Sequence, residues 1–125
     1  MPAIELYTKN LEEIEQLLEE IFGYGVIYTH QGNFKRLSHG ETGDEIMLYD
    51  YSSGDHIAPF DGDVFENPRG VGLEICLKVK ELSRVRKDLE KRKGIWISEN
   101  SQKPWGTTEF YFRLEEGYLF RIIGA

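Results

Sequence analysis

The chain repeats itself once at an interval of 71 residues, and this repeat constrains its fold more than any other feature. Residues 4–8 alternate between apolar and polar-tolerant side chains, which is typical of a half-buried strand. Residues 11–22 carry apolar side chains at spacings of three and four, which predicts one face of a helix. A shift of 71 places Ile4, Leu6, Thr8, Leu11, Ile14, Leu18 and Gly23 onto Ile75, Leu77, Val79, Leu82, Val85, Leu89 and Gly94. The two halves are therefore predicted to be copies of one module.

Three short strands are predicted after the helix in each half, separated by glycine-containing turns. They cover residues 26–28, 33–37 and 45–51, and then 95–97, 107–114 and 118–123. Two copies of a βαβββ module indicate a duplication, because a solenoid needs three or more repeats. We predict an α+β fold in one domain, residues 1–125, with module one at 1–51, a crossover at 52–70 and module two at 71–125.

The ends of the first helix carry capping signals. Asn10 is predicted to be the N-cap, and Glu13 follows at the spacing that completes a capping box. Gly23 supplies the residue that a left-handed C-cap favours. The crossover, in contrast, combines proline, glycine and acidic residues without periodicity. A loop of that length is usually functional or a linker, and its apolar residues favour a partly packed crossover.

Composition excludes several classes of protein. The formal net charge of -7 argues against nucleic-acid binding, which requires a concentrated basic surface. No segment approaches the roughly 18–20 apolar residues of a membrane span, and residues 1–10 lack the apolar core of a signal peptide. A single cysteine, Cys76, cannot form an internal disulfide, which points to a reducing compartment. We expect a cytoplasmic protein.

Three segments match motifs of a known superfamily. Residues 6–11 resemble its L-Y-V-x-D-L motif before the first helix, and residues 21–24 are similar to its x-L-G-F motif after that helix. Residues 104–118 resemble its W-G-x-x-x-F-x-x-x-D-P-x-G ending, with Leu-Glu-Glu at residues 114–116 where Asp-Pro is usual. With the duplicated module, these motifs resemble the glyoxalase/bleomycin-resistance/dioxygenase superfamily, also called vicinal oxygen chelate proteins. The resemblance implies curved sheets that close around a cavity, and a homodimer.

The resemblance also says where a metal ion would be held. Metal-using members place one donor on the first and the last strand of each module. The family's donor before the helix-facing run of the first strand corresponds to Ala3, and its G-x-x-x-E pattern after the turn corresponds to Met47. The repeat then gives Glu74 and Arg121 as their partners in the second half. A methyl group, a thioether, one carboxylate and a guanidinium do not make a divalent-metal site, which needs several N or O donors. We therefore expect neither a metal nor another cofactor.

Glu74 and Arg121 occupy facing positions and are expected to form an ion pair. Two interpretations stay open. In the first, the guanidinium binds an anionic or carbonyl-bearing ligand, and Glu74 or Glu5 orients it. In the second, the pair is structural and fills the place of a lost site.

Alternation along the strands also selects the side chains that face the predicted cavity, an aromatic wall with a few polar groups as in many ligand pockets. The candidate ligand-binding residues are Glu5, Tyr7, Met47, Tyr49, Glu74, Cys76, Trp105, Tyr111, Arg113 and Arg121, with Lys78 beside them. Aromatic residues in a twisted sheet are also ordinary packing, and Trp105 fits either role. The sequence assigns no catalytic residue: the local sequence fixes no basic neighbour that would activate Cys76. His30, His39 and His56 lack ligand spacing, and the acidic residues 61–66 lack a calcium-loop pattern.

Three functions remain possible at this level. The first is a metal-independent protein that binds a small molecule, with sequestration of an antibiotic or a metabolite as its role. The second is an enzyme of the glyoxalase/lyase or dioxygenase type with a divergent active site. The third is an interaction module without a ligand. Because this fold supports many reactions, the choice has to come from the site.

Overall fold

The structure, a computed structural model, describes residues 3–51 and 72–124. It consists of two compact units, one on each side of residues 52–71, and each unit is described by itself. The predicted crossover therefore lies outside the described residues.

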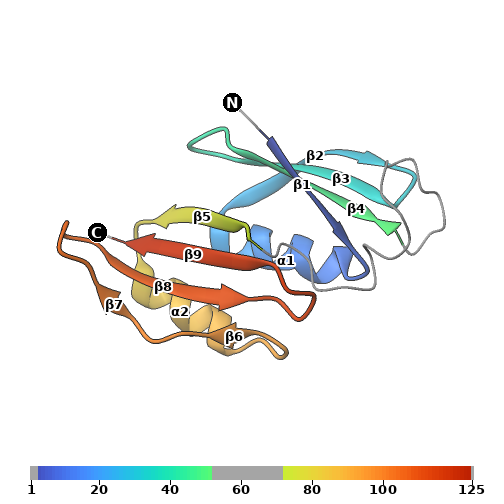
Figure 1. The fold of residues 1–125 in the computed structure, drawn as a ribbon. Helices are drawn as coiled ribbons and strands as arrows, with labels where there is room; N and C mark the ends of the chain where they lie inside the picture. The colour runs from blue at the N-terminus through green and yellow to red at the C-terminus, as the bar shows by residue number, and fades with distance from the viewer. Residues whose placement is uncertain (1–2, 52–71, 125) are drawn as a thin grey trace. The chain divides into compact units, whose positions relative to one another are not determined.

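The first unit has the predicted βαβββ order (Figure 1). Its elements are β1 (Ala3–Thr8), α1 (Leu11–Phe22), β2 (Tyr24–His30), β3 (Phe34–His39) and β4 (Glu45–Asp50). The strands form one sheet in the order β1-β4-β3-β2, with β1 parallel to β4 and the other pairs antiparallel. The parallel pair is possible because α1 and the two strands after it carry the chain back to the start of β4.

The second unit repeats this arrangement. Its elements are β5 (Glu74–Val79), α2 (Leu82–Glu90), β6 (Trp96–Ile97), β7 (Ser101–Gln102), β8 (Thr108–Arg113) and β9 (Leu119–Gly124). The sheet order is β5-β9-β8-β6, β5 is parallel to β9, and β7 is an additional short strand that pairs with β8. The predicted duplication is confirmed at the level of topology.

Each helix covers one face of its own sheet. In the first unit, α1 packs against β2 and β4 and buries Leu18, while Leu6, Leu37 and Leu48 are fully buried on the strands. Lys35 lies on the same face as Leu37 and Leu48, and its ammonium forms an ion pair with Glu15 of α1. The other face of this sheet is called the open face of unit one.

In the second unit, α2 covers the face that carries Phe112 and Phe120 (Figure 1). These two rings are fully buried and stack with their centroids 4.6 Å apart. From α2, the guanidinium carbon of Arg86 lies 5.2 Å from the centroid of the Phe110 ring, which is on the same face. The opposite face is called the open face of unit two.

Two details of the helix ends differ from the sequence prediction. The Asn10 side chain makes no capping hydrogen bond, so the predicted capping box with Glu13 is wrong. Instead, the buried hydroxyl of Thr8 accepts a hydrogen bond from the Asn10 backbone N–H at 2.8 Å, and this contact fixes the turn into α1. The second helix ends at Glu90, with Lys91 in right-handed geometry as its C-cap, so Gly94 does not repeat the capping role of Gly23.

Gly23 does end α1 in left-handed geometry, with φ of 77° and its N–H bonded to the Leu18 carbonyl. We expect Gly23→Ala to lower the free energy of unfolding by about 1–2 kcal/mol, because an L-residue pays that cost in this region. The added Cβ would also lie 3.3 Å from Nε2 of His39. Urea unfolding measures the change, and Gly40→Ala is the control because a Cβ there meets no atom within 4 Å. Equal stability of the two variants would contradict this account.

Candidate functional site

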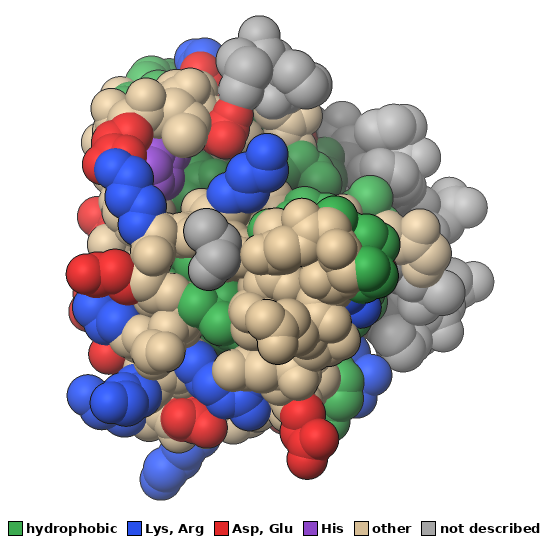
Figure 2. All heavy atoms as spheres, turned by 90° about the vertical axis from the view of Figure 1, so that its left-hand side faces the viewer, with side chains coloured by type: hydrophobic (Ala, Val, Ile, Leu, Met, Phe, Trp, Pro, Cys, Tyr) green, Lys and Arg blue, Asp and Glu red, His purple; other side chains and the backbone are tan. Residues whose placement is uncertain are grey.

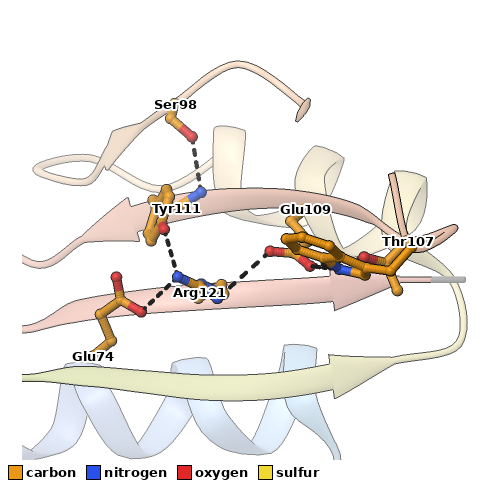
Figure 3. Close-up of polar contacts among 7 residues, drawn as sticks. Glu74, Ser98, Thr107, Glu109, Tyr111 and Arg121 are labelled. Carbon is orange, nitrogen blue, oxygen red and sulfur yellow. Dashed lines mark hydrogen bonds and ion pairs between the residues drawn. The ribbon is translucent and has the colours of Figure 1, made fainter. Parts of the chain in front are cut away.

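Alternation along β5, β8 and β9 brings polar side chains together on the open face of unit two. Arg121 on the central strand β9 has Cys76 of β5 and Tyr111 of β8 as its direct cross-strand partners. Glu74 and Glu109 lie diagonally from it on the same face. Figure 3 shows these side chains, apart from that of Cys76, over the sheet. We call Glu74, Glu109, Tyr111 and Arg121 the Arg121 cluster.

Arg121 is the centre of this cluster. Its Nη2 donates a hydrogen bond to the Tyr111 hydroxyl at 2.9 Å and lies 3.0 Å from a carboxylate oxygen of Glu74 (Figure 3). Its Nη1 lies 3.8 Å from Oε1 of Glu109. The hydrogen bond to Tyr111 is the largest cause that raises the pKa of Arg121, and the charge of Glu74 adds to it. The predicted ion pair between Glu74 and Arg121 is confirmed.

Glu109 is a buried carboxylate that the sequence analysis did not select. Its side chain is only 4% exposed. Oε2 accepts hydrogen bonds from the Thr107 hydroxyl at 2.7 Å and from the Trp105 indole N–H at 3.2 Å. The hydrogen bond from Thr107 is the main cause that holds the pKa of Glu109 below its ordinary value, followed by Trp105 and the charge of Arg121. Glu109 therefore stays ionised while buried.

Two atoms of the cluster lack hydrogen-bond partners among the described residues. Oε1 of Glu109 and Nε of Arg121 are both buried, and neither makes a hydrogen bond. The first requires a donor and the second requires an acceptor. Buried polar atoms without partners are uncommon, and they mark this cluster as strained or functional.

The remaining candidates of unit two are placed as follows. Trp105 is 68% exposed, so its ring is not part of the core of this unit, and its role at the rim of a pocket or in the packing of the turn stays a prediction. Its indole N–H donates a hydrogen bond to Glu109. Cys76 is exposed beside Arg121. The guanidinium carbon of Arg113 lies 5.2 Å from the centroid of the half-exposed Trp96 ring, at the far end of β8.

The four candidates of unit one share its open face. Glu5 pairs with Met47 and Tyr7 pairs with Tyr49 across β1 and β4, and the two tyrosine rings lie 5.4 Å apart. Burial is the main cause that raises the pKa of Glu5, and its hydrogen bond with Tyr7 partly offsets this. Burial and the neighbouring Glu5 charge raise the pKa of Tyr7. That these residues line one cavity with those of unit two stays a prediction.

The side chains at the four family metal positions do not fit a metal ion. Arg121 and Glu74 occupy two of those positions. Nη2 of Arg121 is paired with the Glu74 carboxylate, which is the only carboxylate among the four side chains. Ala3 and Met47 supply no hard donor at the other two. Within residues 3–51 and 72–124, no group of three or more His, Cys, Asp and Glu side chains could hold a metal. The acidic residues 61–66 and His56 lie outside the described residues.

His39 has a structural role in the turn between β3 and β4. Its Nδ1 accepts hydrogen bonds from the backbone N–H groups of Glu41 at 3.1 Å and Thr42 at 3.2 Å. Its ring also packs edge-on against Tyr24, with centroids 5.3 Å apart. Nδ1, the ring nitrogen that faces the turn, therefore already accepts hydrogen bonds from the backbone.

Charges of both signs are mixed on the surface. On α2, Arg84 pairs with Glu81 at 2.9 Å and with Asp88 at 3.2 Å. Figure 2 shows one face of the molecule, on which basic and acidic side chains lie interspersed. Among the described helices, none is long and apolar enough to cross a membrane.

Comparison with known proteins supports the fold. No protein-family model matches the chain, and no curated protein sequence matches it. Solved structures do match. A bleomycin-binding protein, in a crystal structure of its complex with bleomycin, is 14% identical with a TM-score of 0.63, and the match covers 100% of this chain and 98% of that one. The chain has the glyoxalase/bleomycin-resistance fold.

Two further structures with this fold extend the comparison. The lactoylglutathione lyase of Agrobacterium tumefaciens is 17% identical with a TM-score of 0.66, and the match covers 100% of this chain and 92% of that one. A member of the glyoxalase/bleomycin resistance protein/dioxygenase superfamily from Sphaerobacter thermophilus is 14% identical with a TM-score of 0.65, covering 98% and 94%. The fold predicted from the motifs is confirmed. At these identities, function has to be argued from this chain's own residues.

Proposed function

We propose that this protein binds a small molecule without a metal ion, on the open face of unit two. The observation that carries this proposal is the position of Arg121. Where metal-using members of the superfamily place a metal donor, this chain places a guanidinium that is already paired with Glu74 and Tyr111. A fixed positive charge at that position would repel a divalent ion.

The surroundings of Arg121 suit a small organic ligand. Trp105 presents an indole that is 68% exposed, and Glu109 holds that indole through its N–H. Tyr111 adds a second ring, over which the Arg121 guanidinium carbon lies 5.4 Å from the centroid. Aromatic surfaces with a few fixed polar groups are the usual composition of ligand sites. Cys76 and Arg113 lie on the same face.

The proposal includes a biological role and an assembly. The bleomycin-binding protein shares the fold and binds an antibiotic, so sequestration of an antibiotic or a metabolite is the role that we propose here. We propose that the protein acts as a homodimer in the cytoplasm. The resemblance supports the dimer, and the single exposed cysteine favours a reducing compartment.

Thermal unfolding of EDTA-treated protein tests this proposal. In a panel of antibiotics and aromatic metabolites, we expect at least one compound to raise the unfolding midpoint, equally with and without added divalent metals. A ligand at a concentration of 100 times its Kd contributes about 2.7 kcal/mol to stability, which such a screen detects. Stabilisation that requires added zinc, nickel, iron or manganese would overturn metal independence.

One observation in unit one favours the enzyme as the second candidate. The raised pKa of Glu5, next to the hydroxyl of Tyr7, is a property of carboxyl groups that transfer protons. A glyoxalase/lyase or dioxygenase reaction would use such a group. Turnover of hemithioacetal or catechol substrates, lost in Glu5→Gln and retained in Glu15→Gln, would establish the enzyme in place of the binding protein.

A further inference from the structure

We infer that the ligand of the open face of unit two presents a neutral amide edge, with its carbonyl oxygen on the Tyr111 hydroxyl and its N–H on the Glu74 carboxylate. This inference rests on the proposed function and adds the chemical class of the ligand. It is argued from the hydrogen bonds that the Arg121 cluster makes and from those that it leaves unmade.

Tyr111 supplies the donor. Its hydroxyl oxygen accepts a hydrogen bond from Nη2 of Arg121 at 2.9 Å (Figure 3). A hydroxyl has one hydrogen to donate, and that hydrogen points away from a donor which the oxygen already accepts. No side chain or backbone group within residues 3–51 and 72–124 accepts it. Contact with a guanidinium also polarises the O–H bond, which makes the hydroxyl a stronger donor.

Glu74 supplies the acceptor. Its side chain is 36% exposed, and among the described residues only Oε2 has a partner, Nη2 of Arg121 at 3.0 Å. A carboxylate can accept hydrogen bonds on both oxygens, so Oε1 remains available toward solvent. The Tyr111 hydroxyl and the Glu74 carboxylate thus each lie within 3.0 Å of the same nitrogen. The donor of Tyr111 and the acceptor of Glu74 therefore lie on either side of Nη2, as the carbonyl oxygen and the N–H of one amide require.

The charges around Arg121 exclude the two simpler ligand classes. An anionic ligand gains little at Arg121 itself, because Glu74 and the buried Glu109 already flank that guanidinium. The next basic residues of this face, Lys78 and Arg113, lie one residue pair further along β5 and β8. An anionic ligand would also be repelled by the exposed oxygen of Glu74. An amine, protonated at neutral pH, would satisfy Glu74, but as an ammonium it offers no acceptor for the Tyr111 hydrogen. A neutral amide or lactam on an aromatic ring satisfies both groups, and the ring can stack on the exposed indole of Trp105.

Three compounds of equal shape test the inference. They carry a carboxamide, a carboxylate or an amidine on the same naphthalene ring, and their binding is measured by calorimetry at neutral pH. We expect the carboxamide to bind most tightly. Tyr111→Phe should weaken its binding about tenfold, the value of one hydrogen bond to a polarised donor. Tyr28→Phe, the same substitution on an exposed tyrosine of unit one, should leave it unchanged.

The outcomes separate this inference from the proposed function. Tighter binding of the carboxylate or the amidine would overturn the amide class while the binding function stands. The amide class would also be overturned if Tyr111→Phe, shown by circular dichroism to be folded, bound the carboxamide as tightly as the wild type does. If none of the three binds but the wider panel stabilises the protein, the amide class alone fails. If the panel is silent as well, both fail.

Discussion

Replacing Phe120 by alanine should lower the free energy of unfolding by about 3–5 kcal/mol, the cost of deleting a buried aromatic ring. Phe120 lies on the central strand of unit two, between Ile75 of β5 and Phe112 of β8. Its side chain is fully buried, and its ring stacks on Phe112 with an interplanar angle of 2°. Deleting the ring removes this contact and leaves a cavity that strands on both sides prevent from collapsing.

Urea unfolding followed by circular dichroism measures this loss. Leu119→Ala is the matched control, because Leu119 is the preceding residue on β9 and points to the open face, where it is only partly buried. It should cost less than half as much, since the loss scales with the apolar area removed from water. Equal losses in the two variants would mean that the face covered by α2 is not the core of this unit.

The topology could be predicted because it depends on local periodicity. In each half, alternation over the first strand and three-to-four spacing over the helix are set by neighbouring residues alone. The end of α2 was predicted wrongly. The last buried residue of α2 is Leu89. Lys91, Arg92 and Lys93 add no apolar side chain to the core, so burial does not stabilise a further helical turn up to Gly94. The repeat does not show which residues are buried, and burial determines where α2 ends.

The site could be predicted in part for the same reason. Alternation shows which face a side chain occupies, and the family resemblance indicates which strands carry the site, so the pair of Glu74 and Arg121 could be predicted. Glu109 did not, because its burial depends on the loop before β8. There, Gly106 adopts a φ of 98°, and the residues on either side, Trp105 and Thr107, both bond to Glu109. A carboxylate directly before three consecutive aromatic residues of β8, Phe110, Tyr111 and Phe112, was the available signal.

Arg121→Met should lower the unfolding midpoint at neutral pH and weaken binding of the naphthalene carboxamide by at least tenfold, the value of one charge-assisted hydrogen bond. The variant leaves Glu109 ionised and buried without its nearby cation, which destabilises the folded state. It also removes the donor that orients the Tyr111 hydroxyl. Arg84→Met on α2 is the control, because its two ion pairs are exposed and contribute little. Loss of stability with unchanged binding would make the pair of Glu74 and Arg121 purely structural.

The dependence of stability on pH shows whether Glu109 is responsible. Its pKa in the folded state is below the ordinary value of 4.5, so the unfolded chain binds more protons as the pH falls through that region. The contribution of Glu109 is therefore complete above pH 4.5 and is lost as acid protonates the folded carboxyl. Without Arg121 this pKa rises, although Thr107 and Trp105 still hold it down, so Glu109 contributes less stability at neutral pH and less is lost in acid. The midpoints of the wild type and Arg121→Met should then converge in acid, where a protonated Glu109 needs no cation. Arg121→Lys should restore the neutral-pH stability but not the carboxamide affinity. An ammonium supplies the charge near Glu109 but lacks the planar guanidinium, in which Nη1 faces Glu109 while Nη2 holds Tyr111 and Glu74. A constant gap between wild type and Arg121→Met at every pH would show that the guanidinium acts through packing alone.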